Sequence, residues 1–232
     1  MSVNDLVLVQ GMADTRASLR RWRRDPNAVL APWLLLSLAI AVALLLAVWA
    51  IAMLSTPDPT PLFLPGVHFD PTPVNVVKVL YRNSLVLALH AMACVAGFIA
   101  GSSLPQQAQQ KTGLSKKIHD HAGRLAIGFV VCATTFSLVT QAYVLGGGAA
   151  TLAYELGISR GVLLLALLPH ALPELVALFL PLAAWLIASR RGAWDELLAA
   201  TFATVAVAAP TLIAAALVEI YVTPQLLIAL TG

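Results

Sequence analysis

Five long apolar runs constrain the fold of this 232-residue chain more than any other feature. They cover residues 32–54, 84–104, 125–145, 161–189 and 197–222. A helix rises about 1.5 Å per residue, so roughly 20 such residues cross a hydrocarbon core about 30 Å thick. Because a backbone in lipid must satisfy its own hydrogen bonds, each run is predicted to form a transmembrane helix. We therefore predict an all-α polytopic membrane helix bundle with five spans.

The composition agrees with lipid as the main solvent. Hydrophobic residues make up 59% of the chain and charged residues 11%, whereas soluble proteins carry roughly 25% charged residues. The polar remainder is too short for a second folded domain, so residues 32–232 are predicted to form one membrane domain behind a basic segment, residues 1–31. No basic stripe is interleaved with aromatic side chains, so nucleic acid is excluded as a partner.

Lys and Arg alternate from one loop to the next and predict the orientation. The basic amino-terminal segment contains Arg16, Arg20, Arg21, Arg23 and Arg24. The second and fourth loops carry four and two further basic residues near the span ends, and the tail carries none. By the positive-inside rule the amino terminus is cytoplasmic and the carboxyl terminus external, in the cytoplasmic (inner) membrane. The alternative for the basic segment is that Leu19 and Trp22 let part of it lie along the membrane surface.

The fourth apolar run contains the most unusual stretch of the chain, Leu168-Pro169-His170-Ala171-Leu172-Pro173-Glu174. His170 and Glu174 are four residues apart and share a helical face. Pro169 and Pro173 each remove a backbone donor, so we expect the fourth span to be kinked or broken there. Ionisable side chains are expensive in a bilayer and indicate a functional site, with this stretch as its centre.

Two further ionisable residues are expected to join this centre. His90 lies near the external end of the second span, and Glu219 lies near the external end of the fifth. Together with His170 and Glu174 they predict a polar pocket in the outer half of the bundle. Three interpretations are open: the groups satisfy one another and fix a kink, they form a binding or docking site, or they handle protons or ions.

Small residues and prolines predict packing faces and connections. Ala93, Gly97 and Gly101 form a small-residue stripe that permits close helix approach, either within this chain or in a homodimer. Three consecutive glycines at 146–148 are expected to stop the third helix or to act as an elbow. The connection over residues 55–83 is rich in proline and is expected to resist regular helix, as an external contact loop or as a stiff connector.

The sequence carries no Walker or GxGxxG pattern, no zinc-ligand cassette and no plausible nucleophile beside a base. His119 and His121 flank Asp120 but do not share a helical face, and Cys94 and Cys132 lie in apolar spans. We therefore expect no enzymatic activity, no catalytic residue, no metal and no cofactor.

The chain resembles the stage II sporulation protein M family of multi-span membrane proteins over residues 81–224. The resemblance is carried by Arg82-Asn83-Ser84, by Gly97 and Gly101, by Leu168-Pro169-His170 followed by Glu174, and by the run from Glu219 to Pro224. The chain departs from the family in Ala171, where glycine is common, in the additional Pro173, and in a single asparagine at Asn83.

This resemblance implies a non-enzymatic membrane component, with Arg82 and Asn83 added to the predicted site. The namesake anchors peptidoglycan-degrading partners during engulfment, and many relatives are encoded beside a MoxR-type ATPase and von Willebrand factor-like proteins. The sequence therefore predicts a membrane scaffold that recruits an envelope or peptidoglycan-remodelling machine. The alternative is a permease or transport subunit that uses a broken helix around His170 and Glu174.

Overall fold

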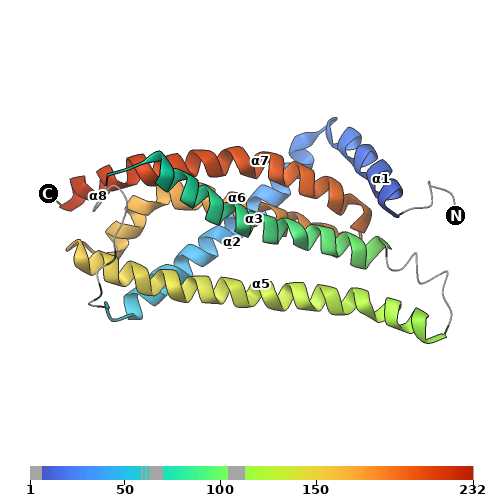
Figure 1. The fold of residues 1–232 in the computed structure, drawn as a ribbon, viewed down its shortest axis with the longest axis horizontal. Coiled ribbons are helices and arrows are strands. Elements are labelled where there is room, and N and C mark those ends of the chain that lie inside the picture. The colour runs from blue at the N-terminus through green and yellow to red at the C-terminus, as the bar shows by residue number, and fades with distance from the viewer. Residues whose placement is uncertain (1–6, 59, 61, 63–69, 104–112, 232) are drawn as a thin grey trace. The chain divides into compact units, whose positions relative to one another are not determined.

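The computed structural model describes residues 7–58, 60, 62, 70–103 and 113–231 (Figure 1). Side chains are described from residue 11 to 101 within those ranges and from 128 to 230. The elements are α1 (Val7–Trp22), α2 (Pro26–Leu54), α3 (Pro73–Phe98), η2 (Ile99–Ser103), α5 (Gly113–Glu155), α6 (Arg160–Arg191), η3 (Trp194–Glu196), α7 (Leu197–Leu217), η4 (Val218–Val222) and α8 (Thr223–Thr231). All are helical, and the described residues contain no strand.

Five helical segments in the described part of the chain are long and apolar enough to cross a membrane. They are Pro26–Leu54, Pro73–Gly101, Gly128–Glu155, Arg160–Arg191 and Trp194–Leu230. This confirms the all-α, five-span, multi-pass prediction. The helices extend beyond the apolar runs because polar residues at a membrane surface continue the same backbone hydrogen bonding.

Two expectations about connections are wrong. Residues 73–83 were expected to lie in the irregular connection but form the first turns of α3, with Pro73 at its first position. Proline suits that position because its missing N–H would have no partner there. The glycines at 146–148 neither stop nor interrupt α5, which continues to Glu155.

Helix α5 ends at Gly157 rather than at the glycines of residues 146–148, and α6 ends at Gly192. Gly157 and Gly192 have φ of +65° and +69°, which is the left-handed conformation that glycine adopts without steric cost. Beyond Gly157, the Ile158 N–H donates to the Ala153 carbonyl at 3.1 Å. Beyond Gly192, the Ala193 N–H donates to the Ala188 carbonyl at 3.0 Å. These are Schellman caps, which satisfy carbonyls that would otherwise lack partners.

The contacts of the chain fall into two compact units, each built from stretches of several helices. Unit 1 comprises the described residues within 1–37, 86–134 and 178–208. Unit 2 comprises the described residues within 38–85, 135–177 and 209–232. Helix α2 begins in unit 1 and ends in unit 2, whereas α6 begins in unit 2 and ends in unit 1. The expectation of a single membrane domain stays a prediction.

The small-residue stripe of α3 packs inside unit 1. A Cβ atom built on Gly97 would lie 2.6 Å from Nε1 of Trp185 and 2.8 Å from Leu197. One built on Gly101 would overlap the Trp194 ring. The neighbours of this stripe therefore include side chains from α6, η3 and α7 of the same chain. A homodimer stays a prediction.

Hydrogen bonds in unit 2 fasten the start of the proline-rich connection to α5 and α6. The Asp58 N–H donates to Thr151 Oγ1 at 3.0 Å, and the Leu62 N–H donates to Glu155 Oε1 at 2.7 Å. Arg160 donates to the carbonyls of Met53 and Ser55 at the end of α2. These bonds satisfy carbonyls that have no partner within α2.

Candidate functional site: a polar cluster in unit 2

Helix α6 is a continuous α-helix through Pro169 and Pro173. The gap in the helix that the sequence predicted is therefore not present, and a bend at Pro169 or Pro173 stays a prediction. Proline in a helix removes one backbone bond, and the two prolines here lie on the exposed side of α6. His170 lies on the buried side, where 8% of its surface remains exposed.

The polar stretch of α6 pairs with the end of the fifth span. Nδ1 of His170 lies 2.8 Å from Oγ1 of Thr223, and both side chains are buried. One turn along, the carboxyl groups of Glu174 and Glu219 are close enough to interact electrostatically. The two pairs are successive contacts between α6 and the η4–α8 segment, because each pair lies four residues from the other along both helices.

Glu219 lies in a π-helical turn. The Thr223 N–H donates to the Val218 carbonyl, five residues earlier, and Pro224 follows without an N–H of its own. Single π-helical turns inside α-helices occur often at functional sites. The turn separates α7 from α8 and contains Glu219, one of the two acidic residues of the cluster.

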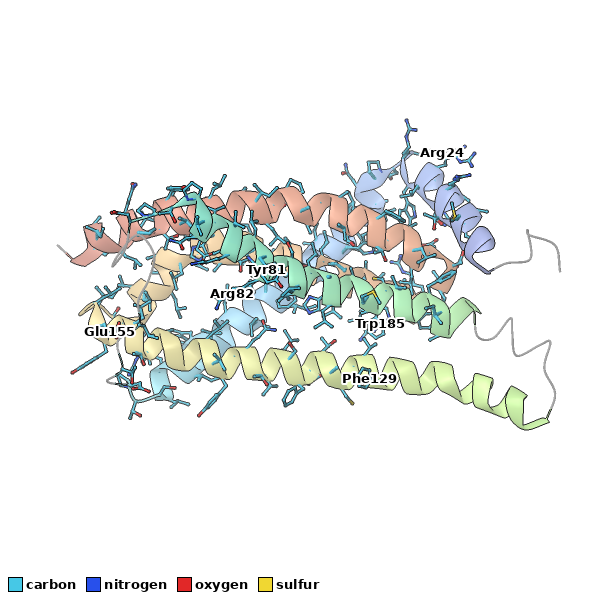
Figure 2. All side chains as sticks on the ribbon, in the orientation of Figure 1. Arg24, Tyr81, Arg82, Phe129, Glu155 and Trp185 are labelled. Carbon is cyan, nitrogen blue, oxygen red and sulfur yellow. The ribbon has the colours of Figure 1, made fainter. Side chains whose placement is uncertain are left out.

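Helix α3 adds a third side to the cluster. The Asn83 side chain interacts with the Glu174 carboxyl, and Arg82 interacts electrostatically with Glu219 without forming a direct ion pair. Figure 2 marks Arg82 on α3 beside Tyr81. Ile220 packs on Val76 in a small apolar cluster, which fixes α3 against the end of the fifth span.

Two polar atoms of this cluster are buried and unsatisfied. Nδ2 of Asn83 and Oε2 of Glu174 make no hydrogen bond of good geometry within the described part of the chain. The contact between Asn83 and Glu174 is therefore electrostatic proximity rather than a well-formed bond. A buried polar group without a partner costs about 1–3 kcal/mol, so a further polar group that reached these atoms would stabilise them.

His90 is not brought into this cluster. It belongs to unit 1, where its Nδ1 lies 2.8 Å from the Leu178 carbonyl and its ring packs against Phe179 at 5.6 Å. Cys94, one turn further along α3, donates from Sγ to the Pro181 carbonyl at 3.2 Å. Both residues join α3 to α6 by satisfying their own polar groups.

The structure thus brings together five of the six sequence-predicted site residues: Arg82, Asn83, His170, Glu174 and Glu219. Sequence reasoning missed Thr223 as the partner of His170. Its position four residues after Glu219, matching the spacing of His170 and Glu174, is the pattern that could have identified it.

The cluster combines two carboxyl groups, one guanidinium and one amide, and it can bind a group that both donates and accepts hydrogen bonds. Within the described residues, no set of three or more His, Cys, Asp and Glu side chains could hold a metal ion. His119 and Asp120 lie outside the residues whose side chains are described. Comparison of the chain with protein-family models, curated proteins and solved structures finds no match.

Proposed function

We propose that this chain is a non-enzymatic membrane scaffold that docks an envelope or peptidoglycan-remodelling machine at the polar cluster of unit 2. The buried, unsatisfied Oε2 of Glu174 and Nδ2 of Asn83 carry this proposal. A partner that supplies a donor to the carboxylate and an acceptor to the amide would relieve both costs at once. The family resemblance supplies the class of partner, which includes a MoxR-type ATPase system.

Orientation decides which machine can reach the cluster. The cluster lies at the start of α3 and at the end of the fifth span. With the amino terminus in the cytoplasm, as the positive-inside rule predicts, these helix ends face the exterior of an inner membrane. A partner at this face would act on the cell envelope rather than in the cytoplasm.

The test is recovery of partner proteins from native membranes with an affinity-tagged chain. Glu174→Gln and Asn83→Ala are expected to reduce recovery of the specific partners about tenfold, since a hydrogen bond to a charged group contributes about 1.5–3 kcal/mol. Glu155→Gln is the matched control, because it makes the same carboxyl-to-amide change in unit 2 while its oxygen still accepts from Leu62. Equal recovery with all three variants would contradict the docking site.

The second candidate is a permease or transport subunit. The observation that favours it is the closeness of the Glu174 and Glu219 carboxyl groups, since two such groups in an apolar bundle can share a proton or a cation. A flux assay in proteoliposomes, with Glu174→Gln as the inactive variant, separates the two functions. Gradient-driven flux that Glu174→Gln abolishes would favour transport over the scaffold.

A further inference from the structure

Unit 1 contains a cavity of about 310 Å³ where several helices begin or end. The end of α1, the start of α2, the end of α6 and η3 surround it. Its size falls at the lower end of small-molecule sites, which span about 300–1,000 Å³. This cavity is independent of the polar cluster, which belongs to unit 2.

The walls of the cavity are amphipathic. Val29, Trp33 and Ile187 supply an apolar part, and Arg21 and Arg191 supply exposed cationic groups. The Trp22 and Trp33 rings meet edge to face, with centroids 5.3 Å apart. Tryptophan and arginine together are typical of the level at which a membrane helix meets the headgroup region.

The two carboxylates of the cavity are already engaged. Asp25 Oδ1 accepts the Ala28 N–H at 3.1 Å and caps the start of α2, and Glu196 pairs with Arg21. Arg191 makes no ion pair with any described residue. An anionic ligand would thus find one unengaged guanidinium and a second that it can share with Glu196.

The flanking chain is also cationic. Arg23 and Arg24 follow α1. Both residues lie between Trp22 and Asp25, which line the cavity, and they therefore flank it along the chain. Basic pockets between transmembrane helices bind anionic lipid headgroups, and the apolar wall suits the acyl chains of a lipid.

We propose that this cavity binds one anionic phospholipid. The phosphate contacts Arg191 and Arg21, and the glycerol and upper acyl chains lie against Val29, Trp33 and Ile187. Guanidinium groups bind phosphate oxygens in a bidentate manner. This geometry favours phosphate more than a charge interaction alone would. The bound lipid would hold the end of α1 against the ends of α2 and α6.

The experiment measures lipid binding to the purified chain by native mass spectrometry, with the melting temperature as a second readout. The probes are dioctanoyl phosphatidylglycerol, dioctanoyl phosphatidylcholine and inorganic phosphate. Phosphatidylglycerol is expected to bind and to raise the melting temperature. Arg191→Gln should weaken that binding at least about fivefold, the effect of one basic residue at a membrane surface.

Arg190→Gln is the matched control, because it removes the same charge at the neighbouring position without lining the cavity. It should bind phosphatidylglycerol within about twofold of the unaltered chain, and Arg191→Lys should retain part of the affinity. Equal losses in Arg190→Gln and Arg191→Gln would overturn the proposal. The proposal would also be overturned if phosphatidylcholine bound as tightly as phosphatidylglycerol. It would be overturned as well if inorganic phosphate displaced bound phosphatidylglycerol as effectively as added phosphatidylglycerol does.

Discussion

At the scale of single residues, the cluster is organised by one spacing repeated on two helices. His170 and Glu174 are four apart, as are Glu219 and Thr223, and the two helices pair them in reverse order. The sequence contained this pairing. Two helices joined by a short turn run antiparallel, so when His170 lies opposite Thr223, Glu174 lies opposite Glu219. The position of His90 could not be predicted in this way. Its partner is the backbone carbonyl of Leu178, and a backbone carbonyl has no side-chain pattern in the sequence that would identify it.

The bond between His170 and Thr223 is expected to stabilise the chain measurably. Thr223→Val keeps the shape of the side chain but leaves buried Nδ1 of His170 without its partner, at an expected cost of about 1–3 kcal/mol. The measurement is reversible unfolding in detergent of Thr223→Val, His170→Ala and the double variant. A coupling energy of at least about 0.5 kcal/mol is expected; strictly additive effects would contradict the bond.

At the scale of elements, the glycines illustrate what sequence could and could not predict. The stripe at Gly97 and Gly101 was predicted to be a packing face, because small residues four apart fall on one side of a helix, and Trp185, Leu197 and Trp194 lie against it. The three glycines at 146–148 were wrongly predicted to interrupt a helix. A Cβ on Gly146 would lie 2.6 Å from Ile51, so close packing against α2 explains that glycine. Only the tertiary neighbour distinguishes these two roles.

Gly97→Ala is expected to destabilise the chain by about 1–3 kcal/mol, because the added methyl group must displace the Trp185 and Leu197 side chains. Gly147→Ala is the control, since a Cβ there meets nothing within 4 Å. It should be neutral or stabilise by up to about 1 kcal/mol through helix propensity. Thermal unfolding of both variants in the same detergent checks the prediction, and equal melting temperatures would contradict the packing.

The contact between α1 and η3 is expected to depend on pH. Burial, and then the nearby Asp195 carboxylate, raise the pKa of Asp14. The folded chain therefore holds this proton more tightly than the unfolded chain, and stability falls as pH rises through the interval between the two pKa values. At pH values above both pKa values, Asp14→Asn should increase the free energy of unfolding slightly, by up to about 0.5 kcal/mol. Melting temperatures from pH 3 to 8 test this; a gain that is the same at every pH would contradict it.

At the scale of the whole molecule, five crossings would put the two chain ends on opposite sides of the membrane. Hydropathy suffices for this count because a spanning backbone has few alternatives. The helix bounds and the division into two units depend on packing between distant parts of the chain, which hydropathy does not encode. The membrane orientation is therefore argued from the basic residues alone.

Orientation is tested with single cysteines in a chain whose Cys94 and Cys132 are replaced by alanine. On intact cells, a membrane-impermeant maleimide should label Thr56→Cys, at the end of α2, about tenfold more than Asp195→Cys, in η3. Both native residues are exposed. After the cells are opened, the maleimide should label the two cysteines equally. Preferential labelling of Asp195→Cys on intact cells would reverse the orientation and move the polar cluster to the cytoplasmic face.

The docking proposal is tested most directly by photo-crosslinking in native membranes from Tyr81, which neighbours Arg82 on α3 and is 66% exposed (Figure 2). A benzoylphenylalanine at position 81 preserves an aromatic side chain there. The predicted result is an adduct with another envelope protein that Glu174→Gln reduces about tenfold and Glu155→Gln leaves unchanged. An absence of protein adducts, or an adduct equally strong with Glu174→Gln, would contradict the assignment of this cluster as a docking site.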